Sequence, residues 1–153
     1  MGSDVTKEYE FTPMRPDDLD TVTAAEQRIL QFPWTRGNFA DSLDAGYSAW
    51  IMREAGAMVG YGVVMMAVDE AHLLNISIMP ELQRRGLGRR LLDYFCTSAR
   101  QLGARRMLLE VRLSNVTARA FYDRLGFIPI GERRGYYAAP EGRENAVVMA
   151  LDL

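Results

Sequence analysis

Cysteine, histidine and long apolar runs are scarce in this sequence, and each scarcity excludes a class of protein. Its 153 residues include one cysteine, Cys96, and one histidine, His72. A single cysteine cannot close an internal disulfide, which suits a reducing compartment, and we expect Cys96 to be a small core residue. His72 has no cysteines or carboxylates at metal-ligand spacing around it, so we expect no metal site.

Membrane segments and an excess of positive charge are missing as well. No stretch approaches the roughly 18 apolar residues of a membrane span, and the amino terminus lacks the basic and apolar regions of a signal peptide. We therefore expect a cytoplasmic protein without a membrane partner. Because 18 basic residues oppose 20 acidic ones, the formal net charge is −2. Without a broad positive field we expect no nucleic-acid partner, and any anion site must be local.

What the sequence does contain is a regular succession of apolar patterns. With 48% hydrophobic residues the chain can bury one core, which predicts a single domain over residues 1–153. The predicted elements are a strand at 8–14, helices at 16–30 and 35–46, strands at 47–54, 58–68 and 71–79, a helix at 86–102, a strand at 106–113, a helix at 115–125, and strands from 127 and over 143–153. This order predicts an α/β fold of the α+β type, with helices packed on a mixed sheet.

The segment QRRGLGRRLL, residues 83–92, places four arginines around Gly86 and Gly88, directly before a predicted helix. The apolar residues of that helix share one face and are Leu87, Leu91, Leu92, Phe95, Ala99 and Leu102. The unpaired amides and positive dipole end of such a helix suit a phosphate or pyrophosphate, and the arginines add forked donors. The alternative is a glycine-rich turn with a solvated basic helix start. A P-loop is excluded because no lysine followed by serine or threonine completes it, and a dinucleotide fingerprint is excluded by Leu91 at its third glycine position.

The loop Gln83-Arg84-Arg85-Gly86-Leu87-Gly88 resembles the Q/R-x-x-G-x-G/A loop of the GNAT family of N-acetyltransferases. The resemblance continues through LLEVRLSNVTARAFYDRLGF at 108–127. More narrowly, FPW at 32–34, RRGYY at 133–137 and GRENAVVMAL at 142–151 are similar to bacterial ribosomal-protein-alanine N-acetyltransferases. The resemblance implies the GNAT fold, a mixed and mostly antiparallel sheet of six or seven strands flanked by about four helices.

The resemblance also implies acetyl-CoA as co-substrate, with its pyrophosphate on the arginine and glycine loop. The residues that it places against the cofactor are Ile76, Ser77, Ile78, Gln83, Arg84, Arg85, Gly86, Leu87, Gly88, Arg89, Asn115 and Tyr122. Strand residues around Ile76 to Ile78 would act through main-chain groups, because pantetheine resembles a peptide closely enough to pair with them.

Glu110 is a carboxylate inside an otherwise apolar strand. Desolvation there would raise its pKa and make it a usable general base, whereas an ion pair with Arg112 on the same strand face would lower the pKa. The residue pattern leaves both possibilities open. The resemblance implies that Glu110 is the general base.

Tyr122 lies on the apolar side of its predicted helix, four residues after Ala118 and three before Leu125. It is either a core tyrosine with its hydroxyl bonded to the backbone or, as the resemblance implies, the general acid that protonates the coenzyme A sulfur. Asn115 can cap the same helix, whereas the resemblance implies that it also bonds the cofactor.

The acceptor is the part of the reaction that the sequence defines least. A protein α-amine has a pKa near 7.7 to 8.0 and lysine about 10.4, so a single carboxylate base suits an amino terminus better. The resemblance implies acetylation of the N-terminal alanine of a small-subunit ribosomal protein by a monomer or weak dimer. Transfer to lysine or to a small amine is an alternative, as is a coenzyme A sensor without turnover. Phe32, Trp34, Tyr136 and Tyr137 are candidate walls of a peptide groove or, alternatively, packing residues.

Overall fold

The computed structural model describes residues 8–153, which form seven strands, four α-helices and two 3-10 helices. In chain order the elements are β1 (Glu10–Pro13), η2 (Pro16–Asp18), α1 (Leu19–Ile29), α2 (Arg36–Asp44), β2 (Ser48–Glu54), β3 (Ala57–Ala67), β4 (Glu70–Ile78), η3 (Pro80–Leu82), α3 (Leu87–Gln101), β5 (Arg106–Arg112), α4 (Val116–Arg124), β6 (Ile128–Ala139) and β7 (Gly142–Asp152). Neighbouring strands follow the order β1-β2-β3-β4-β5-β7-β6. β4 and β5 run parallel, whereas β2 with β1 and β3, and β7 with β5 and β6, are antiparallel. The predicted element order and mixed sheet are confirmed.

The chain divides into two compact units. The first contains residues up to Val64 together with Asn75–Asp93, and the second contains Met65–Leu74 together with Tyr94–Leu153. β3, β4 and α3 each contribute residues to both units. The single domain predicted for residues 1–153 stays a prediction. None of the helices in residues 8–153 combines the length and apolar character that a membrane span requires.

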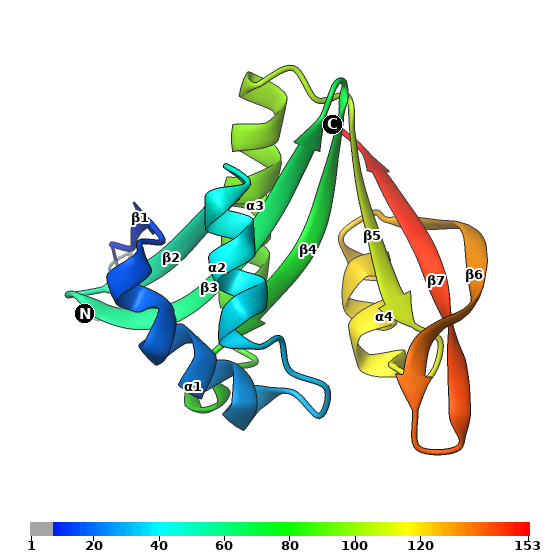
Figure 1. Cartoon of the computed structure of the whole chain (residues 1–153). Coiled ribbons are helices and arrows are strands. Elements are labelled where there is room, and N and C mark those ends of the chain that lie inside the picture. Colours follow the sequence, from blue (N-terminus) through cyan, green and yellow to red (C-terminus); the bar gives the residue numbers. More distant parts are fainter. Residues whose placement is uncertain (1–7) are drawn as a thin grey trace. The chain divides into compact units, whose positions relative to one another are not determined.

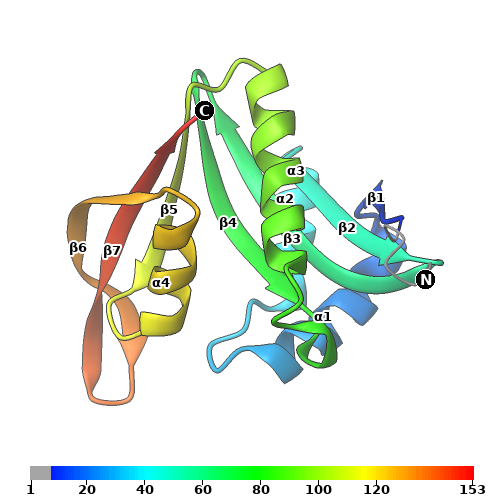
Figure 2. The same cartoon turned by 180° about the vertical axis from the view of Figure 1, so that it is seen from behind.

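In the first unit, α1 and α2 lie on one face of β2 and β3, and the first turns of α3 lie on the other (Figures 1 and 2). The buried residues beneath α1 and α2 are Met14, Leu19, Val22, Ala25, Phe39, Ala49, Ile51, Tyr61 and Val63. Thr35 caps α2, because its Oγ1 accepts a hydrogen bond from Asn38 N at 3.1 Å while Asn38 Oδ1 accepts one from Thr35 N at 2.9 Å. This reciprocal cap fixes where α2 begins.

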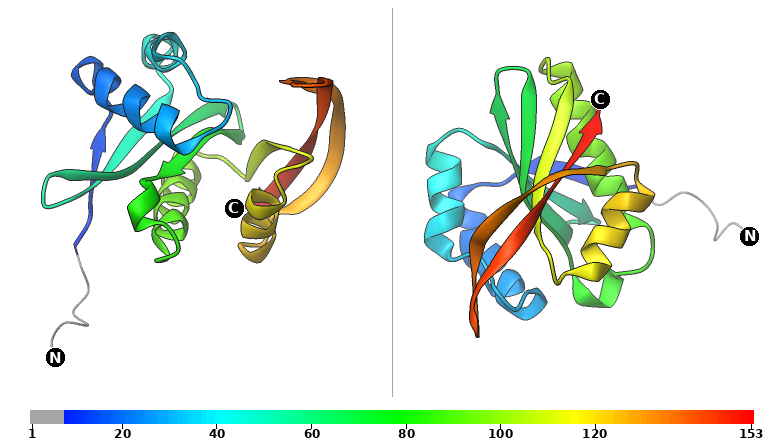
Figure 3. Two further views of the ribbon diagram at one scale, coloured as in Figure 1. Left: turned by 90° about the horizontal axis from the view of Figure 1, so that it is seen from below. Right: turned by 90° about the vertical axis from the view of Figure 1, so that its right-hand side faces the viewer.

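The second unit is built on β5, which is paired to β7, which in turn forms a long twisted hairpin with β6 (Figure 3). Met107, Leu108, Leu109 and Val111 are all buried, so β5 is covered on both faces as its apolar run suggests. The parallel register of β4 with β5 comprises Glu70 to Leu73 opposite Arg106 to Leu109.

Two residues that the sequence pattern assigned to apolar faces are exposed. Leu102 is 65% exposed because α3 ends at Gln101 and the chain turns at Gly103, whose φ is +99°. Leu113 is 40% exposed because β5 ends one residue before it. The apolar periodicity predicted that both elements end one residue later than they do, because periodicity does not show where the backbone turns.

Candidate functional site

The arginine and glycine loop of the first unit connects η3 to α3. Gln83 Nε2 donates to the carbonyl oxygen of Ile78 at 3.0 Å, which ties the loop to the end of β4. Arg84 and Gly86 both have left-handed backbone conformations, with φ of +65° and +78°. The Gly86 carbonyl accepts the first helical hydrogen bond from Arg90 N at 3.2 Å. The amides of Leu87, Gly88 and Arg89 therefore precede the first helical bond of α3 and can donate to an anion.

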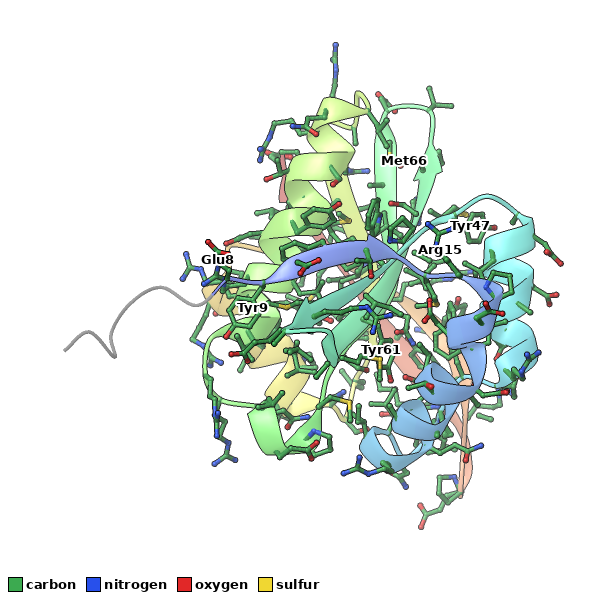
Figure 4. All side chains as sticks on the ribbon, turned by 90° about the vertical axis from the view of Figure 1, so that its left-hand side faces the viewer. Glu8, Tyr9, Arg15, Tyr47, Tyr61 and Met66 are labelled. Carbon is green, nitrogen blue, oxygen red and sulfur yellow. The ribbon has the colours of Figure 1, made fainter. Side chains whose placement is uncertain are left out.

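The arginines of this loop are not offset by any carboxylate of the described residues. Arg84, Arg85 and Arg89 are exposed, and within residues 8–153 no acidic side chain forms an ion pair with them or with Arg90. Arg90 lies over the ring of Tyr9 at 4.7 Å from its centroid; Tyr9, labelled in Figure 4, directly precedes β1. These exposed arginines concentrate positive charge locally on a chain of net negative charge, and the anion site itself stays a prediction.

The last residues of β4 lie close to β3. Ser77 and Ile78 are buried and Ile76 is half-buried. A Cβ on Gly60 of β3 would lie 2.6 Å from the main-chain oxygen of Ser77, so this approach requires glycine. β4 ends at Ile78, the N–H of Met79 still donates to the Val59 carbonyl of β3 at 2.9 Å, and Pro80 then begins η3.

Glu110 of β5 has an ion-pair partner that the sequence pattern did not suggest. Its Oε2 accepts a hydrogen bond from Arg133 Nη1 of β6 at 2.9 Å, and its side chain is 23% exposed. Arg112, the partner considered from sequence, donates instead to Glu144 of β7 at 3.1 Å. The pairing of β5 with β7 and of β7 with β6 brings these charges together, and no local sequence signal reports it.

Tyr122 lies on the buried side of α4, as predicted, and is 9% exposed. Burial, and next the neighbouring Tyr137, raises the pKa of Tyr122 above its ordinary value near 10. Within residues 8–153 its hydroxyl has no hydrogen-bond partner, so the backbone bond of the packing alternative is not formed. The ring packs edge-on against Phe127, with centroids 5.6 Å apart. Among the described residues, no group accepts the hydrogen of this phenol.

Asn115 caps α4, because its Oδ1 accepts a hydrogen bond from Ala118 N at 3.2 Å. The capping bond occupies the oxygen and leaves the side-chain amide hydrogens for another acceptor. Glu144 holds the preceding turn by accepting from Ser114 N at 2.8 Å. Hydrogen bonds from the side chain and backbone of Ser114 keep the pKa of Glu144 below its usual value.

The four residues predicted to bind the acceptor peptide lie in two segments, one in each unit. In the first, Trp34 packs on Phe39 with ring centroids 5.1 Å apart, and Phe32 is exposed. In the second, the rings of Tyr136 and Tyr137 are 4.9 Å apart. Burial first, and the charge of Glu110 second, raises the pKa of Tyr137 to about 12.

Arginines cover both tyrosine rings of the second unit. Arg133 lies 4.3 Å from the centroid of the Tyr136 ring, and Arg112 lies 4.4 Å from that of Tyr137. Because Arg133 also pairs with Glu110, the candidate base and this candidate wall share one guanidinium. Within residues 8–153, no three His, Cys, Asp or Glu side chains gather as a metal-ligand group.

Comparison with known proteins places this chain among acetyltransferases. The sequence profile of the acetyltransferase (GNAT) family matches residues 12–127. The chain belongs to the acetyltransferase (GNAT) family. It is 38% identical over 143 residues to the [ribosomal protein bS18]-alanine N-acetyltransferase of Escherichia coli K12, which covers 94% of this chain and 97% of the relative.

Two solved structures have a fold similar to that of this chain. The crystal structure of the ribosomal-protein-S18-alanine N-acetyltransferase from Escherichia coli has a TM-score of 0.85 and 36% identity, covering 95% of this chain and 94% of that one. Ard1 from Thermoplasma volcanium has a TM-score of 0.84 and 26% identity, covering 95% and 97%. The GNAT fold and the acyltransferase family that the loop resemblance implied are confirmed.

Proposed function

We propose that this GNAT protein transfers acetyl from acetyl-CoA to the α-amine of a protein amino terminus, the N-terminal alanine of a small-subunit ribosomal protein. The observation that carries the proposal is the 38% identity over 94% of the chain to a bS18-alanine N-acetyltransferase. The cationic start of α3, which pairs with no carboxylate of residues 8–153, supports it. Amides of Leu87 to Arg89 and the arginines of the loop are the proposed pyrophosphate site.

Bound acetyl-CoA would supply a thioester whose carbonyl carbon the acceptor nitrogen attacks. Glu110 removes the proton that the amine loses on attack, directly or through water. Tyr122 donates its phenolic proton to the sulfur as the C–S bond breaks, and its raised pKa keeps that proton in place at neutral pH. Main-chain groups of Ile76 to Ile78, which lie beyond the register that β4 forms with β5, pair with the pantetheine arm.

A peptide panel tests the proposal by mass spectrometry. We expect a peptide with an N-terminal alanine to gain one acetyl group when acetyl-CoA is present, with one free thiol released per transfer. The same peptide blocked at its amino terminus, with an internal lysine, serves as the control and should stay unmodified. Acetylation of the blocked peptide or of a polyamine in preference would overturn the choice of acceptor. Thiol release with no acceptor in the panel would overturn direct transfer.

A further inference from the structure

Glu26 of α1 is a buried carboxylate that the proposed chemistry does not use. Its side chain is 0% exposed and lies on the apolar face of α1 with Val22 and Ala25, which are also buried. Within residues 8–153 no arginine, lysine or histidine forms an ion pair with it. A carboxylate taken from water without a cation is costly unless hydrogen bonds replace its hydration.

Three donors from three other segments point at this carboxylate. Tyr61 of β3 donates its hydroxyl to Oε1 at 2.7 Å. Glu26 Oε2 accepts two hydrogen bonds, one from Asn75 Nδ2 of β4 at 3.0 Å and one from the main-chain N–H of Trp34 at 3.0 Å. Tyr61, labelled in Figure 4, is fully buried, so its bond to Glu26 is shielded from water. Burial, and then the hydrogen bond to Glu26, raises the pKa of Tyr61 above its ordinary value.

The Trp34 bond differs from the other two because it restrains main chain. Residues 30–35 lie between α1 and α2 and belong to no helix or strand. The conformation of this segment therefore depends on the contacts that it makes. Glu26 links its backbone to Tyr61 and Asn75, which are held in the sheet, through one rigid group.

We propose that Glu26 is a positioning residue for the acceptor peptide. By holding the Trp34 amide against β3 and β4, it fixes the position of the 30–35 segment. This segment contains Phe32 and Trp34, which are candidates for binding the acceptor peptide. The inference rests on the proposed function, because an acceptor amino terminus is what this segment would bind. Glu26 itself does not exchange a proton with the substrate.

Two substitutions of similar volume separate positioning from charge. In Glu26→Gln the amide oxygen can accept from Trp34 and Asn75, while its nitrogen donates to the Tyr61 oxygen. The Tyr61 hydroxyl can then donate its proton to the Ser77 Oγ. This Oγ is buried, has no hydrogen-bond partner within residues 8–153 and influences the pKa of Tyr61. Glu26→Leu fills the same space but accepts nothing, so the Trp34 amide is released.

Steady-state kinetics with an alanine-starting peptide measure the effect. We expect Glu26→Leu to raise the KM for the peptide by about 10-fold or more, the size of a lost hydrogen bond to a charged acceptor, while the KM for acetyl-CoA stays within about 2-fold. Glu26→Gln should restore the peptide KM to within about 3-fold of the wild type. An unchanged peptide KM in Glu26→Leu would reduce Glu26 to a structural residue. A kcat loss in Glu26→Gln as large as in Glu26→Leu would make its charge part of the chemistry.

Amide hydrogen exchange at Trp34 provides a readout that needs no turnover. The Trp34 amide should be protected in the wild type and in Glu26→Gln, and should exchange about 10-fold faster or more in Glu26→Leu. If Glu26→Leu does not fold, Tyr61→Phe removes the donor that orients the carboxylate and should speed exchange at Trp34 and raise the peptide KM together. No change in either quantity would overturn the proposal. If the wild type fails to acetylate the peptide, the proposed function fails while the exchange data still test the network.

Discussion

Glu110 accepts a hydrogen bond from Arg133, and the same guanidinium lies over the Tyr136 ring. A general base needs an available lone pair, so an acceptor amine has to reach the Glu110 oxygen that Arg133 leaves open or displace the arginine. Tyr122, by contrast, has a hydroxyl without a partner in the described part of the chain and a pKa raised by burial. At the residue scale, the candidate acid Tyr122 has no competing hydrogen bond within the described residues, whereas the candidate base Glu110 is hydrogen-bonded to Arg133.

Tyr122→Phe removes the hydroxyl alone and keeps the ring contact with Phe127. We expect kcat to fall about 100-fold, the usual size of a lost general acid, with the KM for acetyl-CoA changed by less than about 3-fold. Thiol release at saturating peptide measures both. Tyr47→Phe is the control, since it deletes a phenol that is no candidate for the catalytic or binding site, and its kcat should stay near that of the wild type. Equal losses in the two variants would contradict a specific role for Tyr122.

The same phenol makes stability depend on alkaline pH. The pKa of Tyr122 is raised on folding, so the stability that its protonated form contributes is complete below its ordinary value near 10. It is lost as the pH rises through the raised value, because a buried phenolate is poorly solvated. We expect the Tm of the wild type to fall more steeply than that of Tyr122→Phe above about pH 10. Parallel melting curves from pH 8 to 11 would argue that the hydroxyl is hydrated in solution.

At the scale of elements, the loop before α3 depends on a backbone conformation that side chains resist. Gly86 has φ of +78°, and the carbonyl of the same residue accepts the first bond of α3. Arg84, two residues earlier, adopts φ of +65° at some cost. Such strain is retained only where surrounding contacts hold it, here including the Gln83 bond to Ile78.

Gly86→Ala has a matched control in Gly56→Ala of the turn between β2 and β3. Both glycines have left-handed φ, +78° and +84°, and neither has an atom within 4 Å of a new Cβ. Each substitution should therefore cost about 1–2 kcal/mol of stability from backbone strain alone. Only Gly86→Ala should weaken coenzyme A binding, by about 10-fold, because relief of the strain moves the loop. Calorimetric titration of both variants that gave equal affinities would remove the loop from the cofactor site.

At the scale of the molecule, two compact units share β3, β4 and α3. Unfolding either unit removes part of three elements that the other requires, so cooperativity is expected. We propose one domain and expect a single calorimetric transition, with equal calorimetric and van't Hoff enthalpies. Acetyl-CoA at about 100 times its Kd should raise the Tm by about 5–10 °C, from about 2.7 kcal/mol of linkage. Two separate transitions would contradict the single domain.

Local signals predicted most of the elements because each is written in a few adjacent residues. The buried side of α4 and the glycine start of α3 are examples. The ends of α3 and β5 were less accurate, since Leu102 and Leu113 continue the apolar period beyond the turn. The roles of the candidate site residues remain predictions.

Glu26 shows a signal that sequence reasoning could have used. It stands on the apolar face of α1 between Val22 and Ile29, where a charged residue is unusual. What the pattern cannot give is its partners, since Tyr61 and Asn75 are 35 and 49 residues away in the chain. Arg133 was missed for the same reason, because its contact with Glu110 spans 23 residues.

The sequence by itself determined the family, the order of elements and the position of the arginine and glycine loop before α3, since these depend on short patterns of glycine, charge and apolar period. Only the tertiary structure decided which charges meet. The pairing of β6, β7 and β5 gave Glu110 its arginine, and the packing of α1 on β3 and β4 gave Glu26 two of its three donors, Tyr61 and Asn75. Electrostatic interactions act over a few ångströms of space, and the fold sets those distances between residues far apart along the chain.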